Sequence, residues 1–163
     1  MNKTIIIIIL AIAGLIWWGR SNQAAGPSQG GVGTSGNSSM VASEALYDFG
    51  AISMKNGLVS HIFKVANSTD KDIELKTVTT SCMCTKAYIE TASGEKGPFG
   101  MPGMGFVPPA NDLIKARESR DIKVVYDPNA HGPAGIGAID RFVYLTDTNG
   151  ETLQLETKAV VTP

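Results

Sequence analysis

The sequence predicts an all-β fold, an antiparallel β-sandwich, for the chain from about residue 41 to Pro163. Short runs in this region alternate apolar and polar side chains, which is the pattern of a strand with one buried face. Turn-forming residues separate the runs, and no apolar repeat of 3.6 residues follows the N-terminal segment. About six or seven short strands in about 120 residues are typical of a sandwich of two sheets.

The alternating runs follow one another along the chain. In the first, Val59, His61, Phe63 and Val65 share one face. We interpret His61 as a hydrogen-bonded residue of the inner face rather than a metal ligand, because its neighbours on that face are apolar. The runs are 58–66, 73–79, 121–126, 141–146 and 152–161, and turn segments lie at 55–57, 67–70, 127–129 and 149–150.

One segment does not fit the strand pattern. Residues 93–109 contain five glycines, four prolines and two methionines. Glycine and proline at this density predict a long loop within the domain 41–163. Loops longer than about 12–15 residues without secondary structure are uncommon and are often functional.

The N-terminal segment predicts a membrane anchor at residues 1–20. Residues 5–18 contain no charged or strongly polar side chain, and Trp17 and Trp18 suit the boundary between membrane and water. The alternative is a signal peptide whose cleavage would release a secreted domain. Cleavage after Ala24 or Ala25 would place Asn or Gln at the −3 position, where a small residue is required, which favours the anchor.

The charges that flank the apolar run predict its orientation. The amino terminus and Lys3 precede it, and Arg20 follows it. This balance favours a single-pass cell-membrane protein with a cytoplasmic N-terminus and an extracytoplasmic C-terminal domain. Residues 21–40 are rich in Gly and Ser and carry no charge, which predicts a disordered, flexible linker.

Composition excludes several classes of protein. The chain has 14 basic and 15 acidic residues, so it lacks the cationic excess of a nucleic-acid binder. Two cysteines are too few for a disulfide-dense scaffold. No P-loop, G-x-S-x-G, H-E-x-x-H or G-x-G-x-x-G motif is present, so we expect no enzymatic activity and no cofactor.

The Cys82-Met83-Cys84 motif is the most specific local feature. In an extended strand the two thiols would point to one face, with Cα atoms roughly 6.5 Å apart, so a disulfide would require a local kink. Two thiolates on one face would suit a soft metal, and Met101, Met104 and His131 supply further soft or nitrogen donors. The candidate metal ligands are therefore Cys82, Cys84, Met101, Met104 and His131, with Cu(I) as the metal.

Other roles for these residues remain open. The two cysteines would also serve as core residues, as a structural disulfide or as a reactive thiol pair. The methionines would also serve as an apolar loop that covers a sheet edge, and His131 as a solvated turn residue.

Several short motifs occur in an order that resembles a known family. They are Y-D-F-G-A-I at 47–52, H-I-F-K-V-A-N at 61–67, S-C-M-C-T at 81–85, V-V-Y-D-P at 124–128, and the closing pair at 143–148 and 153–160. The region 45–161 resembles the bacterial domain-of-unknown-function family numbered 1573, which implies a Hydin-like, immunoglobulin-type β-sandwich in an often membrane-attached or exported protein. The family has Gly between its two cysteines where this chain has Met83, and 93–109 resembles an insertion. The resemblance implies no reaction.

These observations lead to three expectations about function. The first is a membrane-tethered extracytoplasmic binding or structural module, anchored in membrane lipid and contacting a protein partner, for example by strand addition. The second is a Cu(I)-binding or transfer protein that uses Cys82 and Cys84. The third is a thiol redox protein that uses the same pair.

Overall fold

The computed structural model describes residues 38–163. The predicted anchor at 1–20 and most of the predicted linker at 21–40 lie outside the described residues. Met40, the last residue of that linker range, is buried and begins the first strand. No helix within residues 38–163 is long and apolar enough to cross a membrane.

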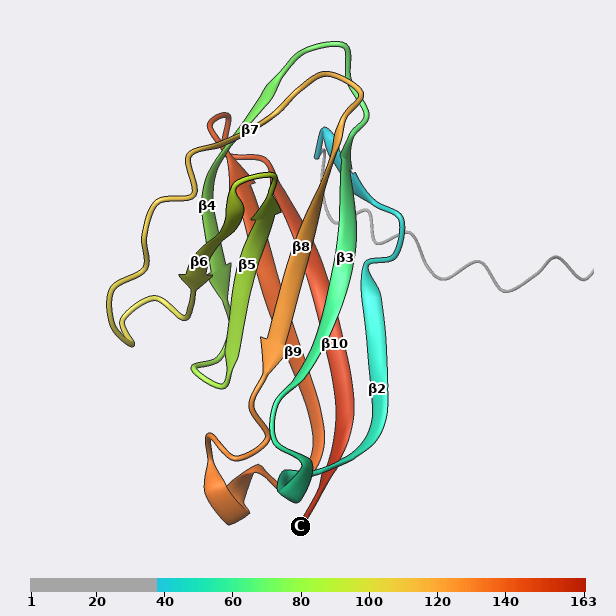
Figure 1. Ribbon diagram of the computed structural model, residues 1–163, viewed down its shortest axis with the longest axis vertical. Coiled ribbons are helices and arrows are strands. Elements are labelled where there is room, and N and C mark those ends of the chain that lie inside the picture. Colours follow the sequence, from blue (N-terminus) through green and yellow to red (C-terminus); the bar gives the residue numbers. More distant parts are fainter. Residues whose placement is uncertain (1–37) are drawn as a thin grey trace, which may run out of the picture.

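The described chain is all-β (Figure 1). Two short 3-10 helices, η1 (Met54–Asn56) and η2 (Gly132–Gly135), accompany the strands. The strands are β1 (Met40–Ala42), β2 (Leu46–Ser53), β3 (Val59–Asn67), β4 (Ile73–Thr80), β5 (Thr85–Thr91), β6 (Gly94–Phe99), β7 (Asp112–Ile114), β8 (Ser119–Tyr126), β9 (Gly137–Asp147) and β10 (Thr152–Thr162).

The strands form a sandwich of two five-stranded sheets. One sheet has the order β1-β3-β8-β5-β6, and the other has the order β2-β10-β9-β4-β7. The predicted sandwich is confirmed, but the prediction that it is antiparallel throughout is wrong, because β2 pairs with β10 in parallel. A pair so distant in sequence is not joined by a hairpin turn, which would have forced the antiparallel direction.

All five predicted alternating runs are strands, as β3, β4, β8, β9 and β10. The prediction of one continuous loop at 93–109 is wrong, because residues 94–99 form β6 and pair with β5. A strand at a sheet edge needs backbone hydrogen bonds on one side only, so it tolerates Pro98. The remaining loop runs from 100 to 111.

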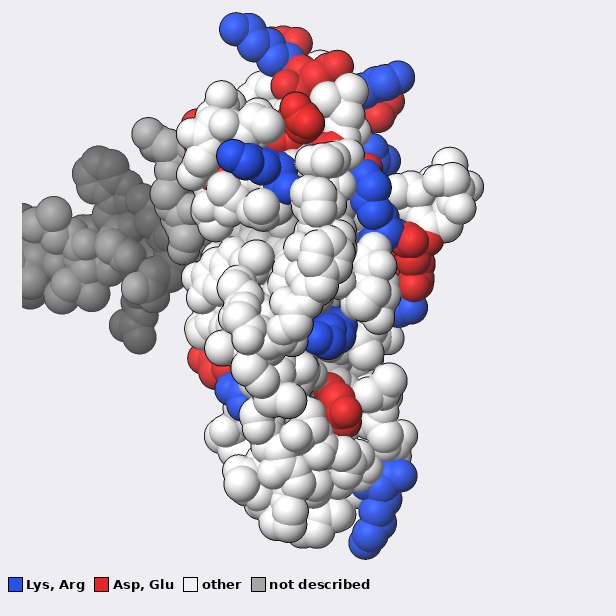
Figure 2. Space-filling view, turned by 90° about the vertical axis from the view of Figure 1, so that its left-hand side faces the viewer, with Lys and Arg blue, Asp and Glu red and all other residues white. Residues whose placement is uncertain are grey.

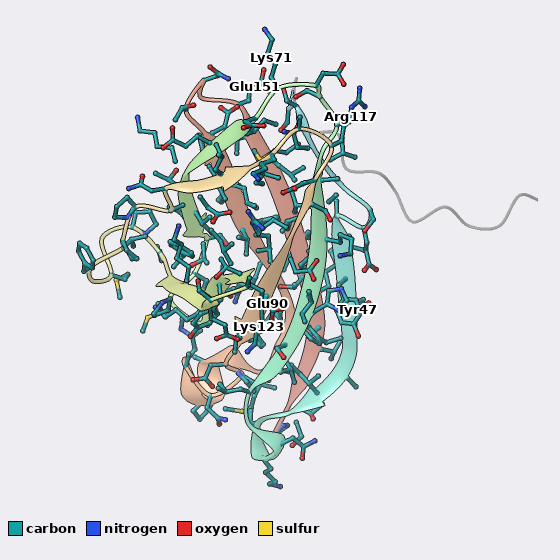
Figure 3. The ribbon with its side chains drawn as sticks, turned by 45° about the horizontal axis from the view of Figure 1, so that its top comes forward. Tyr47, Lys71, Glu90, Arg117, Lys123 and Glu151 are labelled. Atoms are coloured by element: carbon teal, nitrogen blue, oxygen red, sulfur yellow. A yellow bond between two sulfur atoms is a disulfide. The ribbon has the colours of Figure 1, made fainter. Side chains whose placement is uncertain are left out.

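The inward face of β3 follows the predicted alternation. Phe63 and Val65 are almost fully buried in the main core. His61 stacks on Tyr47 of β2 with ring centroids 3.6 Å apart, and its Nε2 lies 3.1 Å from a carboxylate oxygen of Glu44. The interpretation of His61 as a hydrogen-bonded residue of this face is confirmed. Figure 3 labels Tyr47 on the β2 side of the sandwich.

A second, smaller apolar cluster fills one end of the sandwich. Ile52, Ile139 and Val161 pack there with Tyr126 and Cys84. This cluster thus joins Cys84 with Ile52 of β2 and Val161 of β10, and Met54 of η1 packs against it.

Candidate metal and thiol site

The turn between β4 and β5 carries both cysteines. The hydroxyl of Thr80 donates to the backbone carbonyls of Cys82, over 2.9 Å, and of Thr85, over 3.1 Å. The amide of Thr85 donates to the Cys82 carbonyl over 3.1 Å, which closes the turn. The assumption of an extended strand at this motif is therefore wrong, since the chain folds back here and crosses from one sheet to the other.

The fold-back brings the cysteines together. The Cα atoms of Cys82 and Cys84 lie 5.3 Å apart, and the two sulfur atoms form a disulfide. No free cysteine occurs within residues 38–163. Cys82 is partly exposed, whereas Cys84 is 2% exposed. Both cysteines contact the small apolar cluster, but Cys84 is buried in it, whereas Cys82 packs against it and is partly exposed.

His131 joins the pair from a distant part of the sequence. Its Nε2 lies 3.1 Å from the Sγ of Cys82. β5 and β8 are neighbours, with Thr85 opposite Tyr126, so the segment that follows β8 returns beside the turn that precedes β5. A backbone hydrogen bond of 2.8 Å from the amide of Asp127 to the carbonyl of Cys84 fixes the two segments together.

The donor atoms of three predicted ligands form one group. The two sulfurs and a ring nitrogen of His131 all lie within 4.8 Å of one another. Metal–ligand bonds of about 2.0–2.3 Å put the ligand atoms of one ion roughly 3.3–4 Å apart. The spacing therefore fits a single ion once the bond between the sulfurs is open.

Arg141 of β9 approaches the same site and was missed by the sequence reasoning. Its Nε donates to the Sγ of Cys84 over 3.2 Å, and its Nη1 donates to the carbonyl of Asp140. No carboxylate oxygen in the described chain lies within 4.0 Å of its guanidinium. Burial raises the pKa of Tyr126, and the positive charge of Arg141 opposes that shift. Nothing in the sequence pattern of 141–146 distinguished this arginine from a solvent-facing strand residue.

The two methionines lie on the loop 100–111. The amide of Met104 donates to the carbonyl of Met101, and the side chain of Met104 is 52% exposed. A surface pocket lies between this loop and Thr77 and Thr79 of β4, and its loop residues are Pro102, Gly103, Gly105, Val107, Pro108 and Pro109. Of the five predicted ligands, Cys82, Cys84 and His131 are the three whose donor atoms converge within 4.8 Å.

The loop also presents apolar side chains to solvent. Phe106 is 87% exposed. Figure 2 shows this side of the molecule, with charged side chains gathered toward one end and a largely uncharged middle.

Comparison with known families gives one match. The model of the family described as a protein of unknown function, DUF1573, matches residues 40–101. This confirms the resemblance that the short motifs indicated. The DUF1573 match includes the turn with Cys82 and Cys84, whereas His131 and Arg141 lie beyond it. No relative was found among curated proteins.

Solved structures share the fold at low sequence identity. A protein of unknown function from Porphyromonas gingivalis W83 aligns with a TM-score of 0.55 at 15% identity, over 85% of this chain and 51% of that one. A family 123 glycoside hydrolase from Clostridium perfringens aligns with a TM-score of 0.52 at 7% identity, over 73% of this chain and 23% of that one. This chain thus spans about half of the first protein and about a quarter of the second.

A third neighbour is a domain solved both without and with copper. The PCuAC domain of PmoF2 aligns at 14% identity over 66% of this chain and 78% of that one. Its TM-score of 0.36 is too low to bear on this chain's function.

Proposed function

We propose that the domain binds one Cu(I) ion through Cys82, Cys84 and His131 after its disulfide is reduced. The observation that carries this proposal is the convergence of three donor atoms within 4.8 Å, from segments 49 residues apart. Thiolate sulfur is a soft ligand that favours Cu(I), and imidazole also suits copper. Three donors satisfy Cu(I), whereas a structural zinc site normally has four.

The disulfide and the metal complex exclude each other. A dithiol reductant supplies two electrons and two protons, which convert the disulfide into two thiols and leave the reductant as a disulfide. Cu(I) then binds both sulfurs as thiolates and displaces the two protons to solvent. The oxidised domain therefore holds no copper, and the reduced domain binds one ion.

The cellular setting is part of the same proposal. We place the domain outside the cytoplasm, on an N-terminal membrane anchor and a flexible linker, because of the apolar run at 5–18 and the flanking charges. We assign the sandwich to the immunoglobulin-like type on the strength of the motif order. The proposal includes a protein partner that delivers or receives the ion.

Metal titration tests the proposal. Residues 38–163 are reduced with a phosphine under anaerobic conditions and titrated with Cu(I) against a chromogenic chelator. We expect one ion per chain, lost in the Cys82→Ser/Cys84→Ser variant. The His61→Gln variant is the matched control, since His61 lies outside the cluster. Binding by the wild-type domain no tighter than by the double variant would refute copper binding.

A second function is favoured by the unequal exposure of the two sulfurs. In thiol–disulfide exchange, a thiolate of a substrate protein would attack the partly exposed Sγ of Cys82 and break its bond to Cys84. Cys84 would leave as a thiolate that accepts the hydrogen bond from Arg141. A second thiol of the substrate protein then attacks the substrate sulfur of the mixed disulfide and releases Cys82. The substrate gains a disulfide, and the domain is left as a dithiol.

Reaction of the oxidised domain with a dithiol peptide separates the two functions. Stoichiometric oxidation of the peptide, at a rate well above that of a free disulfide, would support exchange. A rate equal to that of glutathione disulfide would eliminate exchange and leave copper binding as the function.

A further inference from the structure

We infer that Arg141 sets the charge preference of the proposed metal site, so that the site selects a monovalent over a divalent soft ion. The inference rests on the proposed function, because it concerns the same pair of sulfurs. It adds a residue that does not bind the metal, and it names the class of ion that the site takes.

The surroundings of Arg141 are the first support. Its Nε points at the Sγ of Cys84, 3.2 Å away, and no carboxylate oxygen of residues 38–163 lies within 4.0 Å of its guanidinium. Partly buried arginines are normally paired with anions. A disulfide sulfur is neutral and a weak acceptor, whereas a thiolate would give this guanidinium an anionic partner.

Burial makes the charge balance matter. Cys84 is 2% exposed, and apolar side chains such as Ile52 and Ile139 pack in the same cluster. Cys82 is partly exposed and His131 is exposed, so water screens charge on their side of the site. Around Cys84 the screening is weaker, and a net charge left there is costly. The ion that brings the total closest to zero is therefore favoured.

The charges of the reduced site can be counted directly. Two thiolates contribute two negative charges, a neutral His131 contributes none, and Arg141 contributes one positive charge. These four groups together give the empty reduced site one net negative charge, which Cu(I) or Ag(I) neutralises. The carboxylate of Asp140 also interacts with Arg141, but it is the same in every protein compared and does not alter the difference that Arg141 makes. Zn(II) would leave one net positive charge beside the guanidinium.

The effect of removing the guanidinium follows from the same count. Without it, the site carries two negative charges, and a divalent ion becomes the neutralising one. The guanidinium repels a divalent ion with twice the energy with which it repels a monovalent ion. Removing it therefore changes the ratio of the two affinities by the energy of one interaction between two unit charges. In a partly solvated site this amounts to roughly tenfold or more.

The experiment compares the dissociation constants for Ag(I) and Zn(II) of the reduced domain without oxygen. The variants are Arg141→Gln, which removes the charge, and Arg141→Lys, which keeps it. Lys64→Gln is the control, because it removes one positive charge from an exposed site on β3. We expect Arg141→Gln to shift the affinity ratio toward Zn(II) by roughly tenfold, while Arg141→Lys and Lys64→Gln stay near the wild-type ratio.

Each outcome has one meaning. An unchanged ratio in Arg141→Gln, with metal binding that still needs both cysteines, would overturn the role of Arg141 and leave the proposed function intact. Wild-type binding no tighter than that of the Cys82→Ser/Cys84→Ser variant would overturn the proposed function, and this inference with it. Circular dichroism checks that Arg141→Gln is folded, and if it unfolds, Arg141→Met, which keeps an apolar stem but no charge, replaces it in the same comparison with the same two outcomes.

Discussion

The imidazole Nε2 of His131 lies 3.1 Å from the Sγ of Cys82, although 49 residues separate them in sequence. The contact depends on the pairing of β5 with β8, which aligns the segment before one strand with the segment after the other. It turns a two-residue cysteine motif into a group of three donors.

Replacing His131 is expected to weaken copper binding without abolishing it. His131→Ala removes one of three donors but leaves both thiolates. Loss of a group that only orients a metal ligand already lowers metal affinity by about 10–100-fold. We therefore expect the Cu(I) affinity of the reduced domain to fall by at least roughly tenfold. Competition with a chromogenic chelator measures this. The affinity of His61→Gln should match wild type, and an equal loss in both variants would contradict a specific role for His131.

The two thiols of the reduced domain should differ in reactivity. Cys84 is 2% exposed and packs in an apolar cluster, whereas Cys82 is partly exposed. Limiting iodoacetamide should therefore modify Cys82 first, because alkylation requires access to the sulfur. Peptide mass spectrometry locates the label. In guanidinium chloride the two residues should react alike, and equal labelling in the native domain would show that Cys84 is accessible.

A pair of phenylalanines tests the core. Phe63 is 1% exposed and Phe106 is 87% exposed. Phe63→Ala should lower the free energy of unfolding by about 3–5 kcal/mol, from lost apolar contact and the cavity left behind. Phe106→Ala should change it by less than about 0.5 kcal/mol. Urea denaturation measures both, and similar effects in the two variants would mean that the face of β3 is misassigned.

The acidic side chain of Asp140 should make stability depend on pH. Partial loss of solvation and the neighbouring Glu156 raise the pKa of Asp140, an otherwise exposed residue, above its usual value. The pKa of Asp140 is higher in the folded than in the unfolded state, so the folded state binds this proton more tightly. The stability that this gives is complete below the unfolded pKa and is lost as the pH rises through the folded pKa. Asp140→Asn should therefore raise the melting temperature relative to wild type at pH 7 and leave it nearly unchanged at pH 3.

Thermal denaturation of both proteins at the two pH values checks this. Asp70→Asn serves as the control, since the Asp70 side chain is 85% exposed and its surface ion pair contributes little. An Asp140→Asn protein less stable than wild type at pH 7 would show that the carboxylate is favourably paired.

The sequence pattern predicted the regular strands well. β3 and β10 each bury one face against the core, so burial imposes the alternation that the sequence displays. β6 escaped prediction because Gly97 and Pro98 indicate a loop, and its strand geometry comes from pairing with β5. The parallel pairing of β2 with β10 is a long-range contact that no local pattern encodes.

The site was predictable only in part. The spacing of Cys82 and Cys84 identified the sulfur pair. The turn that joins them depends on hydrogen bonds from Thr80, which no sequence pattern predicts. His131 was a candidate by residue type alone, and its position follows from strand order. Arg141 reaches Cys84 because β9 pairs with β4, the strand that leads into the cysteine turn, and no local pattern encodes that pairing.

The course of β10 has a practical consequence. Its 11 residues span roughly 35 Å at about 3.3 Å each. At one pole of the sandwich Glu151 accepts a hydrogen bond from Ser39, and Figure 3 shows Glu151 there with Lys71 and Arg117. At the other pole Val161 packs in the same cluster as Cys84, and Pro163 follows two residues later (Figure 1). A polyhistidine tag fused after Pro163 would begin at the pole that carries the sulfurs, where its imidazoles would compete for the ion. An affinity tag should therefore be placed at the opposite pole, near Ser39.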